Sequence, residues 1–588
     1  MLSGHLSSLY GGIILKIHGP SLLLALPFLL AGPAQAANIP PEEGHWCGTT
    51  RLGFAVESAL HGYQERHLQR AREEGKALHT VPEASRVGDV AVIVDDGSII
   101  IQPNQQDIAD FGIQYVPQKK GGYVASPSSA PVSETIGDRV TLGDDDSVAV
   151  TFPKGFKFKF FNKAYTKMFV HSDGNITFVA ADAGSADRDL SRLIGGPPRI
   201  APLFDDLNPE TASGAGGVYV LMEKTKITVT WQDVPEFGSG NHNTFQTVLE
   251  TSGRITFAFS RIDAREALVG IAPGNGGGVQ LIDYRADLPT GVVKTGIAER
   301  FATERAVDNL AIAKAFLREF ADDYDHLIIW LDFPQSLGSA FAFEVTLKNE
   351  VRGLGAEIVD FTQQIGSKGR LRSFVQMGTL TNYPQDVNTT FLGTNTTLDV
   401  LGQESGHRWL AFPRFIDDSG QPNDALLGRD LAHWSFCHNS LASDMEGNEL
   451  RDLGGDRFTT VDATSRYSPL DQYMMGLIPA EDVPPFYFVE PCGNRAGAPA
   501  VGIAVLGRRV DVTIDQIIAA EGPRVPAANK SPHSFNMAFV LVATGDGPSE
   551  DGIAHVERIR AAWEPYFAQA TDGHGTVSTA LKLRRGRR

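Results

Sequence analysis

Two kinds of hydrophobic pattern divide most of the chain into regions. Between residues 139 and 290, short runs such as SVAVTF, KFKFF and KITVTWQDV alternate apolar and polar positions, with Gly, Asn and Asp between the runs. A period of two is typical of half-buried strands. Many short strands at this spacing favour a β-sandwich. We therefore predict a strand-rich domain over residues 139–290.

From residue 295 onward, helical patterns and buried strands replace this alternation. Residues 304–324 carry apolar side chains at helical spacing, and the next segment, 325–333, reads DHLIIWLDF. Such a nearly continuous apolar run predicts a strand that is buried on both faces. Further strands are predicted over 339–347 and 369–378. The order of elements predicts an α+β domain over residues 295–588.

The N-terminal part differs from both regions. Residues 21–36 form a short apolar core that ends in Ala-Gln-Ala, the arrangement of a signal peptide with its cleavage site. The run is too short to span a membrane. We predict a signal peptide over 1–36, a leader or propeptide over 37–125, and a Ser/Pro/Ala-rich linker over 126–138. A small accessory domain is the alternative for the leader. We expect a secreted or periplasmic protein with no membrane span.

Composition and charge restrict the classes of molecule that the chain can bind. The chain has 588 residues, with 52 Lys and Arg against 70 Asp and Glu, so its net charge is −18. This charge argues against a nucleic acid partner, because phosphates would be repelled. The three cysteines are Cys47, Cys437 and Cys492. One disulfide leaves one thiol over; pairing Cys437 with Cys492 would keep the bridge within one domain, and the spacing alone does not decide.

The segment VLGQESGHRW, residues 400–409, carries the candidate catalytic chemistry. A His-Glu-x-x-His helix places two zinc ligands on one face and a general base beside them. Glu404 and His407 stand at the last two of these positions, and Gln403 stands at the first. Three interpretations stay open: a metal bound by Gln403 or by a substitute from elsewhere, an inactive relic of a metal site, and a chance match.

Two glycines lie inside this predicted helix, Gly402 and Gly406. In an exposed helix each would cost about 1 kcal/mol relative to alanine. Their presence therefore predicts that other segments pack closely against the helix.

Three downstream residues are candidates for a further metal ligand. Asp471 lies among apolar residues in SPLDQYMMGL, followed by a tyrosine and two methionines. We favour Asp471 and then His433; for His433, a core histidine beside Trp434 is an equal alternative. Glu446 is interpreted as capping a turn or binding an ion through a loop.

Asp205 and Asp206 form a second candidate site in the strand-rich region. Carboxylate oxygens suit Ca²⁺, and this pair follows an apolar run. Capping of a turn is the alternative. The acidic run at residues 144–146 is interpreted as a solvated turn.

Part of the strand-rich region resembles a known family. The segments GGPPRIAPLFDDLNP (195–209), VTWQDVPEF (229–237), NTFQTVLETSGRITFAF (243–259) and LVGIAPGNG (268–276) resemble the nidogen-type extracellular (NIDO) domain, with the elements in the same order. The resemblance implies an extracellular β-rich module.

Residues 325–490 resemble secreted bacterial zincin-like metallopeptidases through GHRWLAF, LLGRDLAHWSF and SPLDQYMMGL. The expected fold is therefore multidomain: a β-sandwich-like nidogen-type domain followed by an α+β zincin-like domain. The resemblance implies a Zn²⁺-dependent endopeptidase acting on protein or peptide substrates, with Glu404 as general base. The alternative is a non-catalytic extracellular binding or adhesion protein with a degenerate protease domain and an extracellular protein partner.

Overall fold

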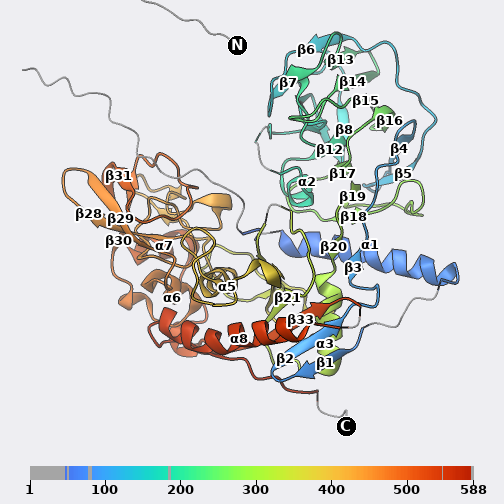
Figure 1. The fold of residues 1–588 in the computed structure, drawn as a ribbon. Helices are drawn as coiled ribbons and strands as arrows, with labels where there is room; N and C mark the ends of the chain where they lie inside the picture. Colours follow the sequence, from blue (N-terminus) through green and yellow to red (C-terminus); the bar gives the residue numbers. More distant parts are fainter. Residues whose placement is uncertain are drawn as a thin grey trace, which may run out of the picture.

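The computed structural model consists of a strand-rich lobe and a mixed α/β lobe, joined by a long helix (Figure 1). Within the described residues no helix combines the length and the apolar character needed to cross a membrane. The predicted signal peptide, residues 1–36, lies outside the described part of the chain. The structure describes residues 47–49, 52–76, 82–182, 184, 187–338, 340–545 and 547–584.

The strand-rich lobe is a sandwich of two seven-stranded sheets. Their strand orders are β18-β19-β17-β12-β11-β10-β7 and β5-β4-β16-β15-β14-β13-β6. Apolar side chains of both sheets, such as Trp231 and Ile271, meet in one hydrophobic core, which is the packing of a β-sandwich. The alternation seen in the sequence thus reflects one buried and one outer face.

The strands of the first sheet are β7 (Ser147–Thr151), β10 (Lys167–His171), β11 (Ile176–Thr177), β12 (Arg199–Phe204), β17 (Ala267–Ala272), β18 (Val279–Leu281) and β19 (Gly296–Phe301). Those of the second sheet are β4 (Gly112–Pro117), β5 (Tyr123–Pro127), β6 (Asp138–Val140), β13 (Gly217–Met222), β14 (Lys226–Val234), β15 (Asn243–Glu250) and β16 (Ile255–Ile262). The lobe also contains helix α2 (Leu190–Gly195) and the hairpin β8 (Phe158–Phe160) and β9 (Lys163–Tyr165).

The mixed lobe is built on a sheet of order β1-β2-β33-β21-β25-β22, with β34 beside β33. The four central strands are mutually parallel, whereas β1 and β22 run antiparallel at the two edges. The strands are β1 (Ala84–Val87), β2 (Val90–Val94), β21 (His326–Leu331), β22 (Phe343–Thr346), β25 (Ser373–Thr379), β33 (Ser534–Ala543) and β34 (Thr576–Ser578).

Both faces of this sheet are covered by helices. In β33 the side chains at 537, 539 and 541 join the core under α5 (Thr397–Gly406) and α8 (Glu550–Ala570). Those at 538, 540 and 542 join the core under α3 (Asn309–Glu319). Burial on both faces explains the continuous apolar run in β21, and the predicted buried strand over 325–333 is confirmed.

Smaller elements complete the mixed lobe. A cystine between Cys437 and Cys492, the pairing that would stay within one domain, ties two of its loops together. The remaining helices are α4 (Thr362–Ile365), α6 (Pro469–Met475) and α7 (Ile514–Glu521). The remaining strands are β3 (Ile100–Ile101), β20 (Ala306–Val307), β23 (Lys348–Asn349), β24 (Val359–Asp360), β26 (Phe415–Ile416), β27 (Pro422–Asn423), β28 (Asn448–Asp452), β29 (Arg457–Ala463), β30 (Phe486–Glu490), β31 (Ala504–Leu506) and β32 (Arg508–Val512).

The leader predicted over 37–125 is shared between the lobes. Its strands β1 and β2 extend the sheet of the mixed lobe, whereas β4 and β5 belong to the sandwich. The physical reason is that so few strands cannot bury their own apolar faces. The segment predicted as a linker, 126–138, is bound at its centre to the sandwich, where the Ser133 amide donates to Gln246 Oε1 at 2.7 Å.

Helix α1 (Gly53–Glu73) contacts both lobes and holds them together. Its apolar side chains pack against the sandwich in one cluster with α2, and Arg66 forms an ion pair with Asp287 of that lobe (2.7 Å). On the other side, Asn309 at the start of α3 donates to Glu57 at 3.1 Å. The leader helix therefore connects the sandwich to the mixed lobe.

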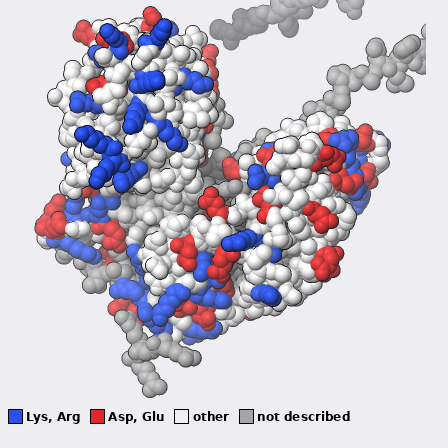
Figure 2. Space-filling view, turned by 180° about the vertical axis from the view of Figure 1, so that it is seen from behind, with Lys and Arg blue, Asp and Glu red and all other residues white. Residues whose placement is uncertain are grey.

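Charge is distributed unevenly over the two lobes. Although the chain is acidic overall, Figure 2 shows Lys and Arg side chains gathered on one face of the strand-rich lobe. This lobe carries five exposed lysines between residues 154 and 167. They are Lys154, Lys157, Lys159, Lys163 and Lys167.

The buried Glu57 makes the docking of α1 depend on pH. Burial raises the pKa of Glu57 from its ordinary value of 4.5 to about 8. Between these values the folded chain holds a proton that the unfolded chain has lost, so stability falls as pH rises through this window. Each pKa unit by which the folded and unfolded chains differ changes the free energy of unfolding by about 1.4 kcal/mol.

We therefore expect the free energy of unfolding of Glu57→Gln to rise by about 2–4 kcal/mol relative to that of the wild type as pH increases from about 5 to about 8. The amide keeps an oxygen that can accept from Asn309 and does not ionise. The measurement is thermal unfolding of both proteins across this range, with Glu65→Gln, an exposed glutamate of the same helix, as control. Parallel pH profiles for wild type and Glu57→Gln would contradict the prediction.

Candidate metal centre

Helix α5 positions the central residues of the candidate centre. It begins with a capping box in which Thr396 accepts from the Asp399 amide and Asp399 accepts from the Thr396 amide. The helix ends at Gly406, and it lies against β22 and β25 of the sheet. Gln403, Glu404 and His407 are all buried, so the polar side of this helix faces the protein interior.

The two glycines of α5 allow a loop to approach it closely. A Cβ atom at Gly402 would lie 2.4 Å from Asp444 Oδ2, and one at Gly406 would lie 2.6 Å from Met445 Sδ. The close packing predicted from these glycines is confirmed. The methionine beside the helix is Met445, whereas the two methionines of SPLDQYMMGL lie within α6.

Three possible ligand atoms converge beside α5. Cys47 Sγ and one ring nitrogen each of His407 and His433 lie within 4.8 Å of one another, and Sγ is 3.2 Å from His407 Nε2. Each imidazole has its Nδ1 within hydrogen-bonding distance of a backbone carbonyl, 3.1 Å from Leu410 O and 3.0 Å from Arg429 O respectively. With Nδ1–H donating, each Nε2 carries a lone pair, the tautomer that metal-ligating histidines have.

The Glu404 carboxylate completes this group. Its Oε2 accepts from Thr49 Oγ1 at 3.0 Å and from Cys47 Sγ at 3.3 Å. Its Oε1 is buried and has no hydrogen-bond partner among the described residues. Burial, and next the neighbouring Cys47, raises the pKa of Glu404 well above its ordinary range. The carboxylate therefore contacts the cluster through Oε2, and its other oxygen is buried without a hydrogen-bond partner among the described residues.

A second polar network lies behind the cluster and is centred on Arg429. Its guanidinium pairs with Glu446, donates to the Cys47 carbonyl at 2.9 Å and approaches His433 Nε2 at 3.1 Å. Burial, and next the charge of Arg429, lowers the pKa of His433 well below its ordinary range. Gln403 Nε2 donates to Glu446 Oε1 at 3.4 Å. The Gln403 amide thus belongs to this network and not to the three-atom cluster.

Asp471, the residue favoured from the sequence as a further ligand, lies elsewhere. It is the third residue of α6 and closes a capping box with Ser468. Its oxygens accept from the Ser468 amide at 2.7 Å and from Trp434 Nε1 at 2.9 Å. Asp471 is buried among apolar residues, as the sequence indicated, and its carboxylate caps the start of α6.

The donor set fits a zinc ion. One thiol and two imidazoles are ordinary zinc ligands, and a tetrahedral ion leaves a fourth position open for water or substrate. Of the sequence-based candidates, the structure brings together His407, His433 and Glu404. Sequence reasoning missed Cys47 as a member of the site; the signal for it was the odd cysteine left over in a chain expected to be exported.

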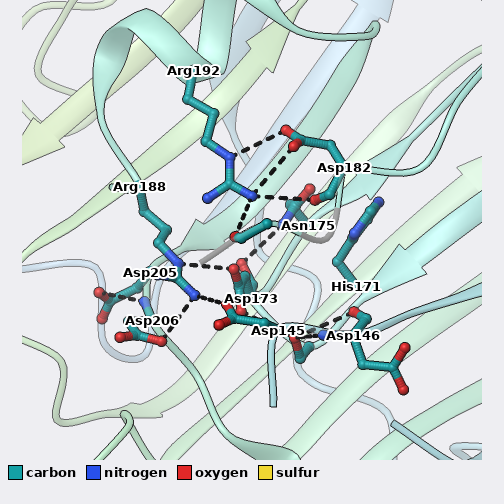
Figure 3. Close-up of polar contacts among 12 residues, drawn as sticks. Asp145, Asp146, His171, Asp173, Asn175, Asp182, Arg188, Arg192, Asp205 and Asp206 are labelled. Atoms are coloured by element: carbon teal, nitrogen blue, oxygen red, sulfur yellow. Dashed lines mark hydrogen bonds and ion pairs between the residues drawn. The ribbon is translucent and has the colours of Figure 1, made fainter. Parts of the chain in front are cut away.

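The second candidate site, in the sandwich, contains an arginine. Carboxylate oxygens of Asp145, Asp173 and Asp206 lie within 4.8 Å of one another. Arg188 pairs with all three, at 2.8 Å to Asp173 and 3.0 Å to Asp206 (Figure 3). In this structure the Arg188 guanidinium supplies positive charge to a cluster that includes Asp206, one of the two residues proposed from the sequence as possible Ca²⁺ ligands.

Asp205, the other residue of the predicted calcium pair, is not one of these three. Its Oδ1 accepts from the Asp206 amide at 2.8 Å. Burial, and next the neighbouring Glu236 carboxylate, raises the pKa of Asp205 well above its ordinary range. These surroundings favour a shared proton at Asp205.

Comparison with known proteins identifies one part of the chain. Residues 122–311 match the family model described as NIDO related, from β5 to the first turn of α3. No curated protein and no solved structure matches the chain. The strand-rich lobe is therefore a NIDO-related domain, in agreement with the nidogen-type resemblance of the segments within 195–276.

The packing of α5 gives a first prediction. Gly402→Ala is expected to destabilise the protein by about 1–3 kcal/mol, because the new methyl group overlaps the Asp444 carboxyl group. Thermal unfolding of the variant measures this loss. Gly62→Ala in α1 is the control, since its Cβ would make only an ordinary contact of 3.6 Å. Equal effects at the two positions would contradict the prediction.

The Arg188 cluster gives a second prediction. Arg188→Gln leaves the three aspartates without a cation and is expected to lower stability by about 1.5–3 kcal/mol, the value of hydrogen bonds to charged groups. Added Ca²⁺ should recover part of this loss in the variant and leave the wild type unchanged. Arg188→Lys, which keeps the charge, is the control. An unchanged unfolding temperature in Arg188→Gln would refute this account.

Proposed function

We propose that the protein is an exported zinc-dependent metallopeptidase that hydrolyses peptide bonds in proteins or peptides. The observation that carries the proposal is that ring nitrogens of His407 and His433 lie close together beside one helix, with the buried Glu404 carboxylate in contact with the same cluster through Cys47. A buried carboxylate next to two imidazoles is the combination that metal-assisted hydrolysis requires. The helix also lies on a mixed sheet, as expected for the zincin-like domain predicted over 295–588.

His407 and His433 would hold the metal, and their Nδ1 contacts to backbone carbonyls orient both rings. A bound Zn²⁺ supplies an activated water and polarises the substrate carbonyl. Glu404 acts as general base, taking the proton of the attacking water and delivering it to the amine that leaves. Burial of all three side chains keeps bulk water away and strengthens these interactions.

The edge strand β22 would hold the substrate. Its one strand partner among the described strands is β25; an extended peptide would pair with its other edge, along which residues 47–49 of the chain lie. A cavity of about 480 Å³ adjoins this edge and is lined by Phe343, Glu344 and Asp430 among others. A peptide paired with β22 would therefore lie beside the cluster and the cavity.

A second candidate function is supported by the position of Arg429. Its Nη2 lies 3.1 Å from His433 Nε2, on the lone pair that a metal would use, and a fixed cation opposes a second cation nearby. In this case the mixed lobe is a scaffold. The NIDO-related lobe would then bind an extracellular protein partner, and the chain would be a non-catalytic binding or adhesion protein.

Metal analysis of the purified chain separates the two functions. We expect about one zinc per chain, as for a three-ligand protein site, and loss of zinc in His407→Ala and His433→Ala. His438→Ala is the control, because this buried histidine contacts the Tyr487 carbonyl outside the cluster. Absence of a bound transition metal from the wild type would reject the peptidase and leave the binding protein.

Hydrolysis of casein tests the role of Glu404. Glu404→Gln is expected to keep its zinc and to lose about 10²–10⁴-fold in rate, the usual contribution of a general base. Glu481→Gln, an exposed glutamate of the same lobe, should retain the rate. Chelator-sensitive hydrolysis that persists in Glu404→Gln would contradict the assigned role.

A further inference from the structure

Residues 47–49 of the leader lie along the edge of β22. Cys47 forms a parallel bridge with Ala342, and the Gly48 amide donates to the Ala342 carbonyl at 2.9 Å. The Glu344 amide donates to Thr49 Oγ1 at 2.7 Å. The chain's own N-terminal segment thus takes the hydrogen bonds that an extended substrate would use.

The side chains of this segment enter the candidate centre. Cys47, which is 2% exposed, places Sγ 3.2 Å from His407 Nε2 and 3.3 Å from Glu404 Oε2. Thr49 donates its hydroxyl to the same oxygen of Glu404. The segment therefore contacts both a candidate metal ligand and the candidate general base.

Two observations distinguish Cys47 from an ordinary buried thiol. Both imidazoles have Nδ1 beside a backbone carbonyl, so each Nε2 keeps a lone pair; Nε2 of His407 lies 3.2 Å from the thiol, and Nε2 of His433 lies 3.1 Å from Arg429 Nη2. In addition, Glu404 Oε1 is fully buried, lies in the same group and has no partner among the described residues. A cation placed among these atoms would use the lone pairs and compensate the unpaired oxygen.

We propose that Cys47 is the third protein ligand of a zinc site formed with His407 and His433, and that residues 47–49 thereby keep the peptidase latent. The inference rests on the proposed function. It adds a ligand from the leader and a form of regulation: the thiolate takes one of the two positions that the histidines leave open, and the backbone of the segment covers the substrate edge of β22. Displacement of this segment opens the site.

The contact that anchors the segment comes from the second polar network. Arg429 donates to the Cys47 carbonyl at 2.9 Å while it pairs with Glu446. A Cβ at Gly48 would lie 2.6 Å from Ala340 Cβ, so the backbone approaches the edge strand closely at this glycine. The segment is held by contacts at the Cys47 carbonyl and at Gly48.

Cobalt is the probe for the ligand. Co²⁺ replaces Zn²⁺ in tetrahedral sites, and a thiolate ligand adds a charge-transfer band to its spectrum. Cys437 and Cys492 form a disulfide, so Cys47 is the one free thiol among the chain's three cysteines. We expect the metal-depleted full chain to show the band when Co²⁺ is added. Co²⁺ bound without the band overturns the inference and leaves the proposed function standing.

Variants test the ligand and the latency separately. Cys47→Ser should lose the band and at least about tenfold in Co²⁺ affinity, a loss that even outer-shell partners of a metal cause. Thr49→Val is the matched control, and it should keep the band because it removes only the hydroxyl contacts to Glu404 and to the Glu344 amide, not the thiol. If Cys47→Ser does not fold, the presence or absence of the band in the wild type and in Thr49→Val still decides whether the thiol binds the metal.

Casein hydrolysis with Zn²⁺ in excess tests the latency. Cys47→Ala is expected to be at least about tenfold faster than the wild type, since a tenfold change needs only about 1.4 kcal/mol of released contacts. Equal rates with an intact band in the wild type would overturn the latency. Failure of the wild type to bind any metal, with His407→Ala giving the same result, would overturn both the proposed function and this inference.

Discussion

The buried guanidinium of Arg429 fixes the segments that form the candidate centre relative to one another. It binds Glu446 from one loop, the Cys47 carbonyl from the leader and His433 from its own loop. A charge in the protein interior is tolerated only when it is paired and its hydrogen bonds are satisfied. Because these partners satisfy one another, displacing any one of them leaves the others with unmet polar groups.

The leader connects the candidate centre to both lobes of the molecule. Residues 47–49 follow the edge of the mixed sheet, α1 packs against the sandwich, and the strands after α1 divide between the two lobes. The NIDO-related lobe and the candidate centre are therefore connected through a segment that belongs to neither one alone. A change in how α1 docks would act on the same segment that places Cys47.

The sequence predicts those features whose cause is local. The helical spacing of apolar residues in α3 and the continuous apolar run of β21 depend on neighbouring residues. The glycines of α5 indicated close packing, although not its partner. Cys47 and its contacts could not be predicted in this way, because they join residues separated by 357 and 360 positions. The apolar setting of Asp471 indicated burial, and a buried carboxylate serves a helix cap as well as it serves a metal.

The enclosure of Cys47 also bears on oxidative folding. Thiolates attack disulfides, so an accessible third thiol in an oxidising compartment allows three alternative pairings among three cysteines to interconvert. Once residues 47–49 are seated, the thiol is buried among histidines and a carboxylate, and Cys437 and Cys492 have only each other as partners. When residues 47–49 are bound in place, the Cys47 thiol can no longer exchange with the Cys437–Cys492 disulfide, and the chain keeps this one pairing.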